Sequence, residues 1–324
     1  MKMIRFKRHF QLWIGLLTMM VVLGGCASNN GGLKIESNYE ELMELQKARE
    51  SDDTLKAEEL PEMTGDDHER LGDVNVSRGN LQMAFVQYQK CLEINPKNTR
   101  VKYKKGMLFV LGKLSDLAVR EFNEILEEDP EHALAHEGLG LALFQMEQYE
   151  DAKTHFQEAV ELDSTLWKAH NMLGVIYDYQ EQYDKATREY RAAIAIRRDD
   201  GLLYNNLGVS YLLAGRYEKA VEAFREGIRR EPSCGRLYNN LGLALAKQGR
   251  HKEALVAFME RGDEARAYNN LGCVYLQQGD QQEAIRFFEK ALDITPTFYE
   301  KAGQNLKKAR AAHVYEIYST PVER

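Results

Sequence analysis

The sequence predicts an all-α protein, an α-solenoid of about seven helix hairpins with a C-terminal capping helix. Seven glycines carry this prediction, because six of them are spaced 34 residues apart and the seventh follows after 30. Each is followed by an alanine twelve residues later and by an aromatic residue four residues after that. Self-similarity at a long fixed period indicates small units that bury their apolar faces only by stacking. The glycines are Gly72, Gly106, Gly140, Gly174, Gly208, Gly242 and Gly272.

With each glycine as position 8, the chain divides into seven predicted units. The alanine then falls at position 20 and the aromatic residue at position 24 of every unit. The aromatic residues are Tyr88, Phe122, Phe156, Tyr190, Phe224, Phe258 and Phe288. The units are residues 65–98, 99–132, 133–166, 167–200, 201–234, 235–264 and 265–298.

Each unit is predicted to fold as two helices. Apolar residues at positions 4, 7, 8 and 11 share one face of a first helix, and those at positions 20, 24 and 27 share one face of a second. A bend with Gly215, Gly249 or Gly279 separates the helices in the better-defined units. We expect the small residues at positions 8 and 20 to let the helices approach closely. The aromatic residue at position 24 should then fill the space against the next unit.

These residues resemble the tetratricopeptide repeat, which has a small residue at position 8, alanine at 20, an aromatic residue at 24 and proline near 32. The resemblance covers Gly65 to about Phe298. It implies a right-handed superhelix whose concave groove binds a protein or peptide partner. Residues 299–324 are predicted to form a capping helix and tail, and the residues that should face the last unit are Ala302, Leu306 and Ala309.

Residues 1–25 are predicted to be a lipoprotein signal peptide. A basic start is followed by an apolar run, residues 12–23, which is short for a membrane-spanning helix. The run leads into Leu-Gly-Gly-Cys26, which resembles the lipobox of bacterial lipoproteins and makes Cys26 the expected lipidated residue. An ordinary cleaved signal, or a signal anchor with a chance cysteine, is the alternative.

Residues 26–64 are then a lipidated N-terminus with a flexible tether and a short helix, which is predicted at Asn38 to Arg49. Three acyl chains on Cys26 would hold the protein firmly on a membrane. Because Ala27 rather than Asp follows the cysteine, the lipoprotein resemblance implies the outer membrane of a bacterial cell envelope, with the protein facing the periplasm.

The charge balance argues against a nucleic-acid partner. The chain has 43 Lys and Arg against 50 Asp and Glu, a formal net charge of -7. All of the acidic residues follow Cys26, whereas four basic residues precede it, so the chain after Cys26 is more acidic still. Phosphate binding requires a basic face. An acidic body suits a protein that is held near a membrane without lying on it.

A column of asparagines is the most specific candidate for binding. In the repeats that this chain resembles, positions 2, 5, 6, 9, 12 and 13 line the groove. Asparagine offers two donors and an acceptor, so a column of them can hold an extended peptide backbone, and arginines can add carboxylate contacts. The alternative is that the asparagines cap or bridge neighbouring helices. The candidate groove residues are Asn171, Asn205, Asn206, Arg236, Asn239, Asn240, Arg266, Asn269 and Asn270.

The sixth unit is shorter than its neighbours by four residues, which is about one helical turn. We expect its second helix to end near Glu260 and the chain to turn at residues 261–263, with Gly262 in the left-handed conformation. The shortening should narrow or kink the groove between Arg236 and Asn270. Short units of this kind resemble TadD-like or PilF-like lipoproteins, which help to assemble bacterial pili.

The sequence offers no convincing catalytic motif, and we expect no enzyme activity, cofactor or metal. His132 and His136 have the i, i+4 spacing of two metal ligands on one helix, but a unit boundary falls between them. His136 and His170 occupy position 4 of their units, where packed or capping imidazoles are expected. The chain has no P-loop, GxSxG or paired CxxC sequence.

We therefore expect a membrane-anchored scaffold that binds a protein partner in its groove, in the assembly of a type IV-like (Tad or Flp) pilus or of a secretion complex. The partner would be a pilus or secretion component, such as a secretin subunit. The alternative is an NlpI-like adaptor that recruits cell-wall hydrolases or proteases.

Overall fold

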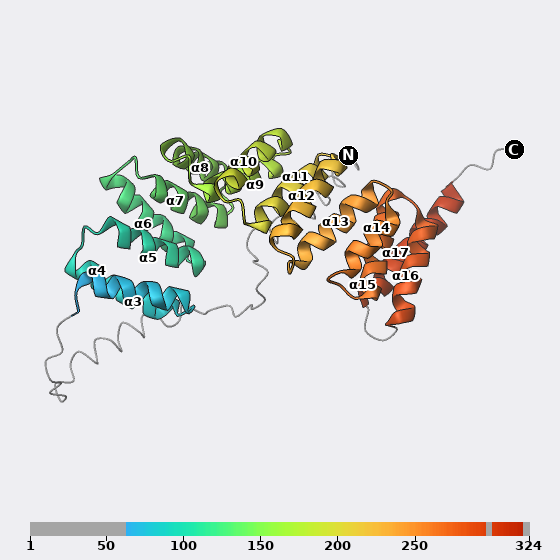
Figure 1. Ribbon diagram of the computed structural model, residues 1–324, viewed down its shortest axis with the longest axis horizontal. Helices are drawn as coiled ribbons and strands as arrows, with labels where there is room; N and C mark the ends of the chain where they lie inside the picture. Colours follow the sequence, from blue (N-terminus) through green and yellow to red (C-terminus); the bar gives the residue numbers. More distant parts are fainter. Residues whose placement is uncertain (1–62, 296–299, 320–324) are drawn as a thin grey trace, which may run out of the picture. The chain divides into compact units, whose positions relative to one another are not determined.

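The computed structural model describes residues 63–295 and 300–319, with side chains as far as residue 313. In these ranges the chain is an all-α helical-repeat solenoid of fifteen helices without a strand (Figure 1). The predicted signal peptide, Cys26 and the helix predicted at Asn38 to Arg49 lie outside the described residues. None of the helices in the described ranges is both long enough and apolar enough to cross a membrane.

The helices group into two compact units, and the division falls between Leu173 and Gly174, inside α9 (Trp167–Tyr179). The first unit holds three helix hairpins: α3 (Gly65–Ser77) with α4 (Leu81–Ile94), α5 (Thr99–Leu111) with α6 (Ser115–Glu128), and α7 (Ala133–Gln145) with α8 (Tyr149–Leu162). The second unit holds α10 (Tyr183–Ile196), α11 (Gly201–Leu213) with α12 (Tyr217–Arg230), α13 (Gly235–Lys247) with α14 (His251–Met259), α15 (Glu264–Gln278) with α16 (Gln281–Ile294), and α17 (Glu300–Ser319).

Polar N-caps start several first helices of the repeats. Asn98, Asp200 and Asp263 each accept a hydrogen bond from a backbone N–H of the first turn, which has no acceptor inside the helix. The first helices of six repeats begin at position 1 of the predicted units, and α15 begins one residue earlier. The sequence thus marks where each hairpin starts.

Position 15 of every repeat adopts the left-handed backbone conformation that ends the first helix. Glycine enters this region without steric cost, whereas other residues pay on the order of 1 kcal/mol. The constant feature of the turn is therefore its geometry and not its residue. Position 15 is Gly79, Gly215, Gly249 and Gly279 in four repeats, and Lys113, Glu147 and Glu181 in the other three.

The glycine at position 8 supports the aromatic ring at position 24 of its own repeat. A Cβ atom on Gly208 would lie 2.5 Å from Cε1 of Phe224, and the other six glycines show the same overlap with their own rings. Because glycine has no side chain, the ring lies directly on the backbone of the first helix and sets the distance between the helices. The sequence-based expectation placed this ring only against the next repeat, whereas the ring also packs on the glycine of its own repeat.

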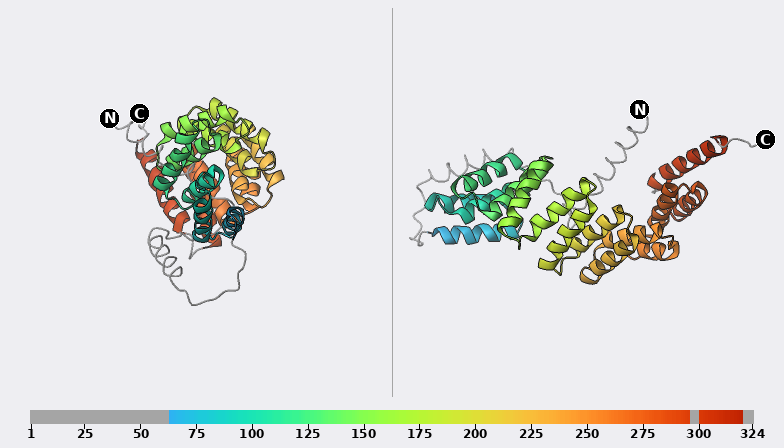
Figure 2. Two further views of the ribbon diagram at one scale, coloured as in Figure 1. Left: turned by 90° about the vertical axis from the view of Figure 1, so that its left-hand side faces the viewer. Right: turned by 90° about the horizontal axis from the view of Figure 1, so that it is seen from above.

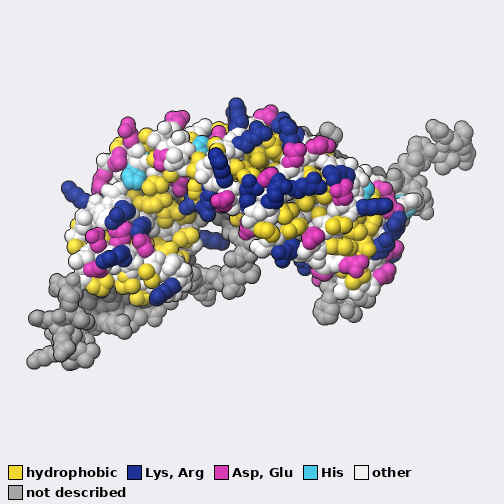
Figure 3. All heavy atoms as spheres, in the orientation of Figure 1, with side chains coloured by type: hydrophobic (Ala, Val, Ile, Leu, Met, Phe, Trp, Pro, Cys, Tyr) yellow, Lys and Arg dark blue, Asp and Glu magenta, His cyan; other side chains and the backbone are white. Residues whose placement is uncertain are grey.

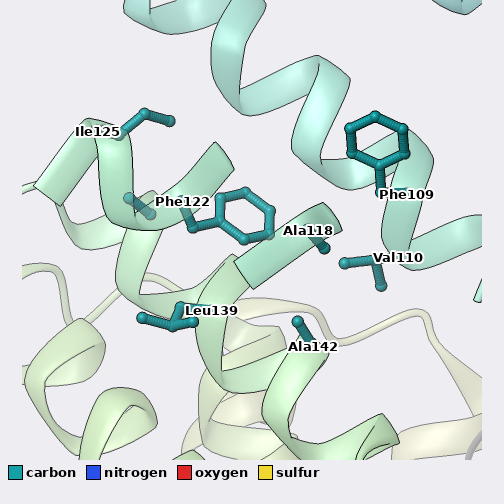
Figure 4. Close-up of a cluster of buried hydrophobic side chains, with 8 residues drawn as sticks. Phe109, Val110, Ala118, Phe122, Ile125, Leu139 and Ala142 are labelled. Atoms are coloured by element: carbon teal, nitrogen blue, oxygen red, sulfur yellow. The ribbon is translucent and has the colours of Figure 1, made fainter. Parts of the chain in front are cut away.

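The next repeat closes over the other side of the ring. A Cβ atom on Gly138 of α7 would lie 2.4 Å from Cζ of Phe122. Phe122 belongs to a buried cluster in which α5, α6 and α7 meet, with Ile125 and Leu139 among its members (Figure 4). The alanines at position 20 are all completely buried, which leaves room for this approach. Phe122 thus joins its hairpin internally and also joins it to the following hairpin.

The sixth repeat is shortened in its second helix, as the missing turn predicts. The helix α14 has nine residues, whereas the other second helices have fourteen. The expected left-handed conformation at Gly262 is wrong, because Gly262 is not among the residues with positive φ. A Cβ atom there would lie 2.7 Å from the carbonyl oxygen of Phe258. Glycine is required at this turn because the chain passes close to the end of α14.

The helix α17 covers the end of the last repeat and lies beside α16 (Figure 2). Ala302, Leu306 and Ala309 are buried, and the last two cluster with Phe288 of α16. These three residues are the ones that the sequence pattern places against the seventh repeat. The ring at position 24 of the seventh repeat is therefore covered by a helix that is not part of a further hairpin.

Replacing Gly208 by alanine should lower the free energy of unfolding by about 1–3 kcal/mol, because the new methyl group overlaps the ring of Phe224. Gly303 in α17 is the matched control, because a Cβ atom there meets nothing within 4 Å. Gly303→Ala should be neutral or stabilising, since alanine favours a helix. Urea denaturation followed by circular dichroism measures both; equal effects of the two substitutions would contradict the close contact.

Candidate functional site

The asparagine column is mostly withdrawn from solvent. In the second unit, Asn205, Asn206 and Asn269 are buried, and Asn240 and Asn270 are half-buried. Asn239 is the exposed member of this group. In the first unit, Asn171 is half-buried.

Several of these asparagines join neighbouring helices of the stack. Nδ2 of Asn240 in α13 donates a hydrogen bond of 2.8 Å to Oδ1 of Asn205 in α11. Nδ2 of Asn305 in α17 donates one of 3.0 Å to Oδ1 of Asn269 in α15. Because these amides satisfy each other inside the stack, the contacts favour the bridging interpretation for Asn205, Asn240 and Asn269.

In the first compact unit, charged side chains rather than asparagines link the first helices of successive repeats. Glu69 of α3 accepts from Lys104 of α5 at 2.7 Å and from Arg100 at 2.6 Å. Glu69 and Lys104 occupy positions 5 and 6 of successive repeats, the positions that Asn205 and Asn240 hold in the second unit. Burial acts to raise the pKa of Glu69, but the hydrogen bonds from Lys104 and Arg100 outweigh it, so this pKa is lowered. Contact between positions 5 and 6 is therefore a recurrent link between repeats.

The two candidate arginines differ in exposure. Arg236 is half-buried, whereas Arg266 is exposed and lies 3.6 Å from the carboxylate of Asp263, the residue that caps α15. Arg266 and Asn239 are thus the candidate groove residues that solvent reaches most freely.

A pocket that the sequence did not reveal lies on the sixth repeat. The pocket has a volume of about 530 Å³ and lies between α12, α13 and α14. Leu241, Leu245 and Val256 contribute apolar surface, and the side chain of Val256 is 60% exposed. Figure 3 shows hydrophobic side chains reaching the surface of the second unit among Lys and Arg side chains. The charged residues around the pocket are Arg225, Arg229, Lys252, Glu253 and Glu260.

A buried carboxyl group links α9, α10 and α11. Asp178 accepts hydrogen bonds from the hydroxyls of Ser210 at 2.6 Å and Tyr190 at 2.9 Å. Burial raises the pKa of Asp178 to about 7, although both hydrogen bonds act to lower it. The only sequence signal for this group is an acid at position 12, where most repeats have an apolar residue.

The structure separates the two histidines that share i, i+4 spacing. His132 caps α7, where its Nδ1 accepts from the backbone N–H of Ala135 at 3.1 Å. His136 instead meets two side chains of α8, His155 and Glu158. Burial is the main reason that the pKa of His155 lies below its usual value. His136 is thus packed, as expected for position 4, but among other titratable groups.

Models of the tetratricopeptide repeat match residues 68–98, 133–166, 171–230, 206–265 and 265–298, which together are more than half of the chain. The chain belongs to the tetratricopeptide-repeat (TPR) family. TPR arrays are scaffolds for protein–protein interaction, and TPR proteins bind protein or peptide partners.

Individual TPR proteins resemble parts of this chain. A TPR repeat-containing protein of Methanocaldococcus jannaschii is 36% identical over 89 residues, which are 27% of this chain and only 14% of that protein. The solved C-terminal part of a TPR repeat-containing protein from Cytophaga hutchinsonii is 19% identical and covers 73% of this chain and 98% of its own, with a TM-score of 0.55. A TPR protein from Parabacteroides merdae is 16% identical and covers 76% and 98%, with a TM-score of 0.51. These two structures share the fold.

Replacing Asn205 by alanine should lower the free energy of unfolding by about 1–3 kcal/mol, because Asn240 loses its acceptor inside the stack. Asn239→Ala is the matched control on the neighbouring repeat, and at an exposed position it should change stability by less than about 0.5 kcal/mol. Thermal and urea unfolding measure both. If Asn205→Ala were as mild as the control, Asn205 would not be a bridge.

Asp178 should make stability depend on pH. Its pKa is raised on folding to about 7, so the folded state binds more protons than the unfolded state between about pH 4 and pH 7. Its contribution to stability is therefore complete below about pH 4 and is lost as the pH rises from there through about 7. Asp178→Asn should remove this dependence, so urea unfolding at pH 5, 6, 7 and 8 should show the variant gaining stability relative to the parent as pH rises. A difference that is constant with pH would contradict the raised pKa.

Proposed function

We propose that this TPR protein is a lipid-anchored adaptor of a bacterial cell envelope, which holds a protein partner during assembly of a pilus or secretion complex. The observation that carries the proposal is a lipobox-like Leu-Gly-Gly-Cys26 placed ahead of a TPR array. The anchor would hold the array on the outer membrane, facing the periplasm. The short sixth repeat, which resembles those of TadD-like and PilF-like lipoproteins, supports a partner from pilus or secretion machinery, such as a secretin subunit.

The pocket of the sixth repeat is the surface best suited to the partner. An apolar hollow bordered by arginines matches the composition of interface centres, where one apolar side chain enters a pocket and polar groups surround it. Arg225 and Arg229 are roughly half exposed at its rim. Three basic side chains against two acidic ones border the pocket, so its chemistry suits a partner segment with an apolar residue beside acidic ones.

The exposed polar groups of the same unit can extend this contact. Asn239 lies on α13, which also lines the pocket, and Arg266 lies on the following first helix, α15. Asn205, Asn240 and Asn269 are occupied by bridges between repeats. We therefore assign peptide contact to Asn239 and Arg266 and helix bridging to the buried asparagines.

Co-purification from detergent-solubilised envelopes tests this function. The tagged parent should retain a pilus or secretion component, and Val256→Gln should reduce its recovery at least about tenfold, because it places a polar group in the pocket. Met83→Gln is the matched control, since Met83 is an exposed apolar residue on the second helix of the first repeat. Cys26→Ser should release the protein from the membrane fraction or leave it unprocessed.

Other results would overturn parts of the proposal. Recovery of cell-wall hydrolases or proteases would favour the NlpI-like alternative over the pilus role. Equal recovery by the Val256 and Met83 variants would exclude the pocket as the binding surface. Unchanged lipid labelling of Cys26→Ser would exclude the lipid anchor.

A further inference from the structure

Three potential metal ligands converge in the third repeat. His136 lies on α7, and His155 and Glu158 lie three residues apart on one face of α8. The Nδ1 atoms of the two histidines are 3.0 Å apart. Oε2 of Glu158 lies 3.0 Å from Nδ1 of His136 and 3.3 Å from Nδ1 of His155. The three atoms therefore form a nearly equilateral triangle.

The size of this triangle fits a small divalent cation. Ligands at about 2.05 Å from a tetrahedral Zn²⁺ ion are separated by roughly 3.3 Å. The observed separations of 3.0, 3.0 and 3.3 Å are equal to this value or slightly smaller. The rings lie within 25° of parallel with centroids 5.2 Å apart, and the partly exposed His155 ring has room to turn its Nδ1 toward an ion.

The hydrogen bonding of His136 supplies a lone pair at the right atom. Its Nε2 lies 2.9 Å from the carbonyl oxygen of Pro130, an acceptor, so in the neutral ring Nε2 carries the proton and Nδ1 does not. Metal-binding histidines commonly donate their second N–H to a backbone carbonyl in this way, which fixes the tautomer and the ring orientation.

When both Nδ1 atoms are unprotonated, the three atoms of the triangle face one another with lone pairs and no proton lies between them. A divalent cation would interact favourably with all three atoms at once.

We propose that His136, His155 and Glu158 form a binding site for a zinc-class divalent cation that joins α7 to α8. Two imidazoles and one carboxylate are a ligand set that suits Zn²⁺ and leaves a fourth position for water. The half-exposed carboxylate of Glu158 gives the site a path to solvent. The site is independent of the partner-binding pocket, which lies in the second unit.

The register of the repeat provides an internal comparison. His136 and His155 occupy positions 4 and 23, and Glu158 occupies position 26 of the third repeat. In the first repeat the same positions hold His68, Gln87 and Lys90, and Nδ1 of His68 lies 2.8 Å from Oε1 of Gln87. In the first repeat, the amide of Gln87 therefore pairs with the one histidine, and the positively charged side chain of Lys90 occupies the position of the third ligand.

Zinc titration of the full chain tests the site. The protein is purified in detergent without a polyhistidine tag, dialysed against EDTA, and titrated with ZnSO₄ by calorimetry. We expect one Zn²⁺ per chain, a weakening of at least about tenfold in Glu158→Gln and in His155→Ala, and no change in His68→Ala. Glu158 is 45% exposed, so its replacement should not prevent folding. Zinc should raise the melting temperature of the parent and of His68→Ala but not of the two site variants.

Replacement by Co²⁺ gives a second readout, because a tetrahedral nitrogen and oxygen environment has visible absorption that the site variants should lose. Failure of the parent to bind Zn²⁺ would overturn the proposal. Binding that survives both site substitutions, or that is lost in His68→Ala, would overturn it as well.

Discussion

The contact between a glycine on the first helix and an aromatic ring on the second is the constraint on which the whole array depends. The ring occupies the space that a Cβ atom would need, so the two helices can pack at this distance only where the first has no side chain. Since all seven repeats make the contact, the two helices of every hairpin are held at a similar distance. Similar hairpins stack with a similar interface each time, and for this reason a chain of nearest-neighbour contacts can form a continuous core.

Polar groups strengthen the stack at a second constant register. Position 5 of one repeat meets position 6 of the next, through Glu69 and Lys104 in the first unit and through Asn205 and Asn240 in the second. Buried polar groups are stable only when they are paired, so these links also fix how successive repeats align. Position 5 and 6 residues that take part in such links are correspondingly less available to a partner.

Individual functions arise where the repeat departs from its own pattern. Beside the shortened helix α14, a pocket lies among Leu241, the exposed Val256 and charged residues. Position 23 is Gln87 in the first repeat and His155 in the third, where it lies against His136. In both cases the scaffold is maintained by the glycine and aromatic contact, which leaves the neighbouring positions free to acquire binding chemistry.

The sequence by itself determined the class of fold, the start of each hairpin, the short sixth repeat and the residues of α17 that cover its end. These features follow from local rules, because periodic apolar positions, N-caps and turn residues act over one or two helical turns. The tertiary structure alone showed that the ring at position 24 packs on the glycine of its own repeat. It also showed that Gly262 is needed because the chain passes close to α14, and it identified the asparagines that bridge helices. It also brought together His136, His155 and Glu158, and Asp178 with Ser210 and Tyr190. Apart from the turn at Gly262, those outcomes depend on contacts between residues 12 to 36 positions apart, whose geometry is set by how the helices pack.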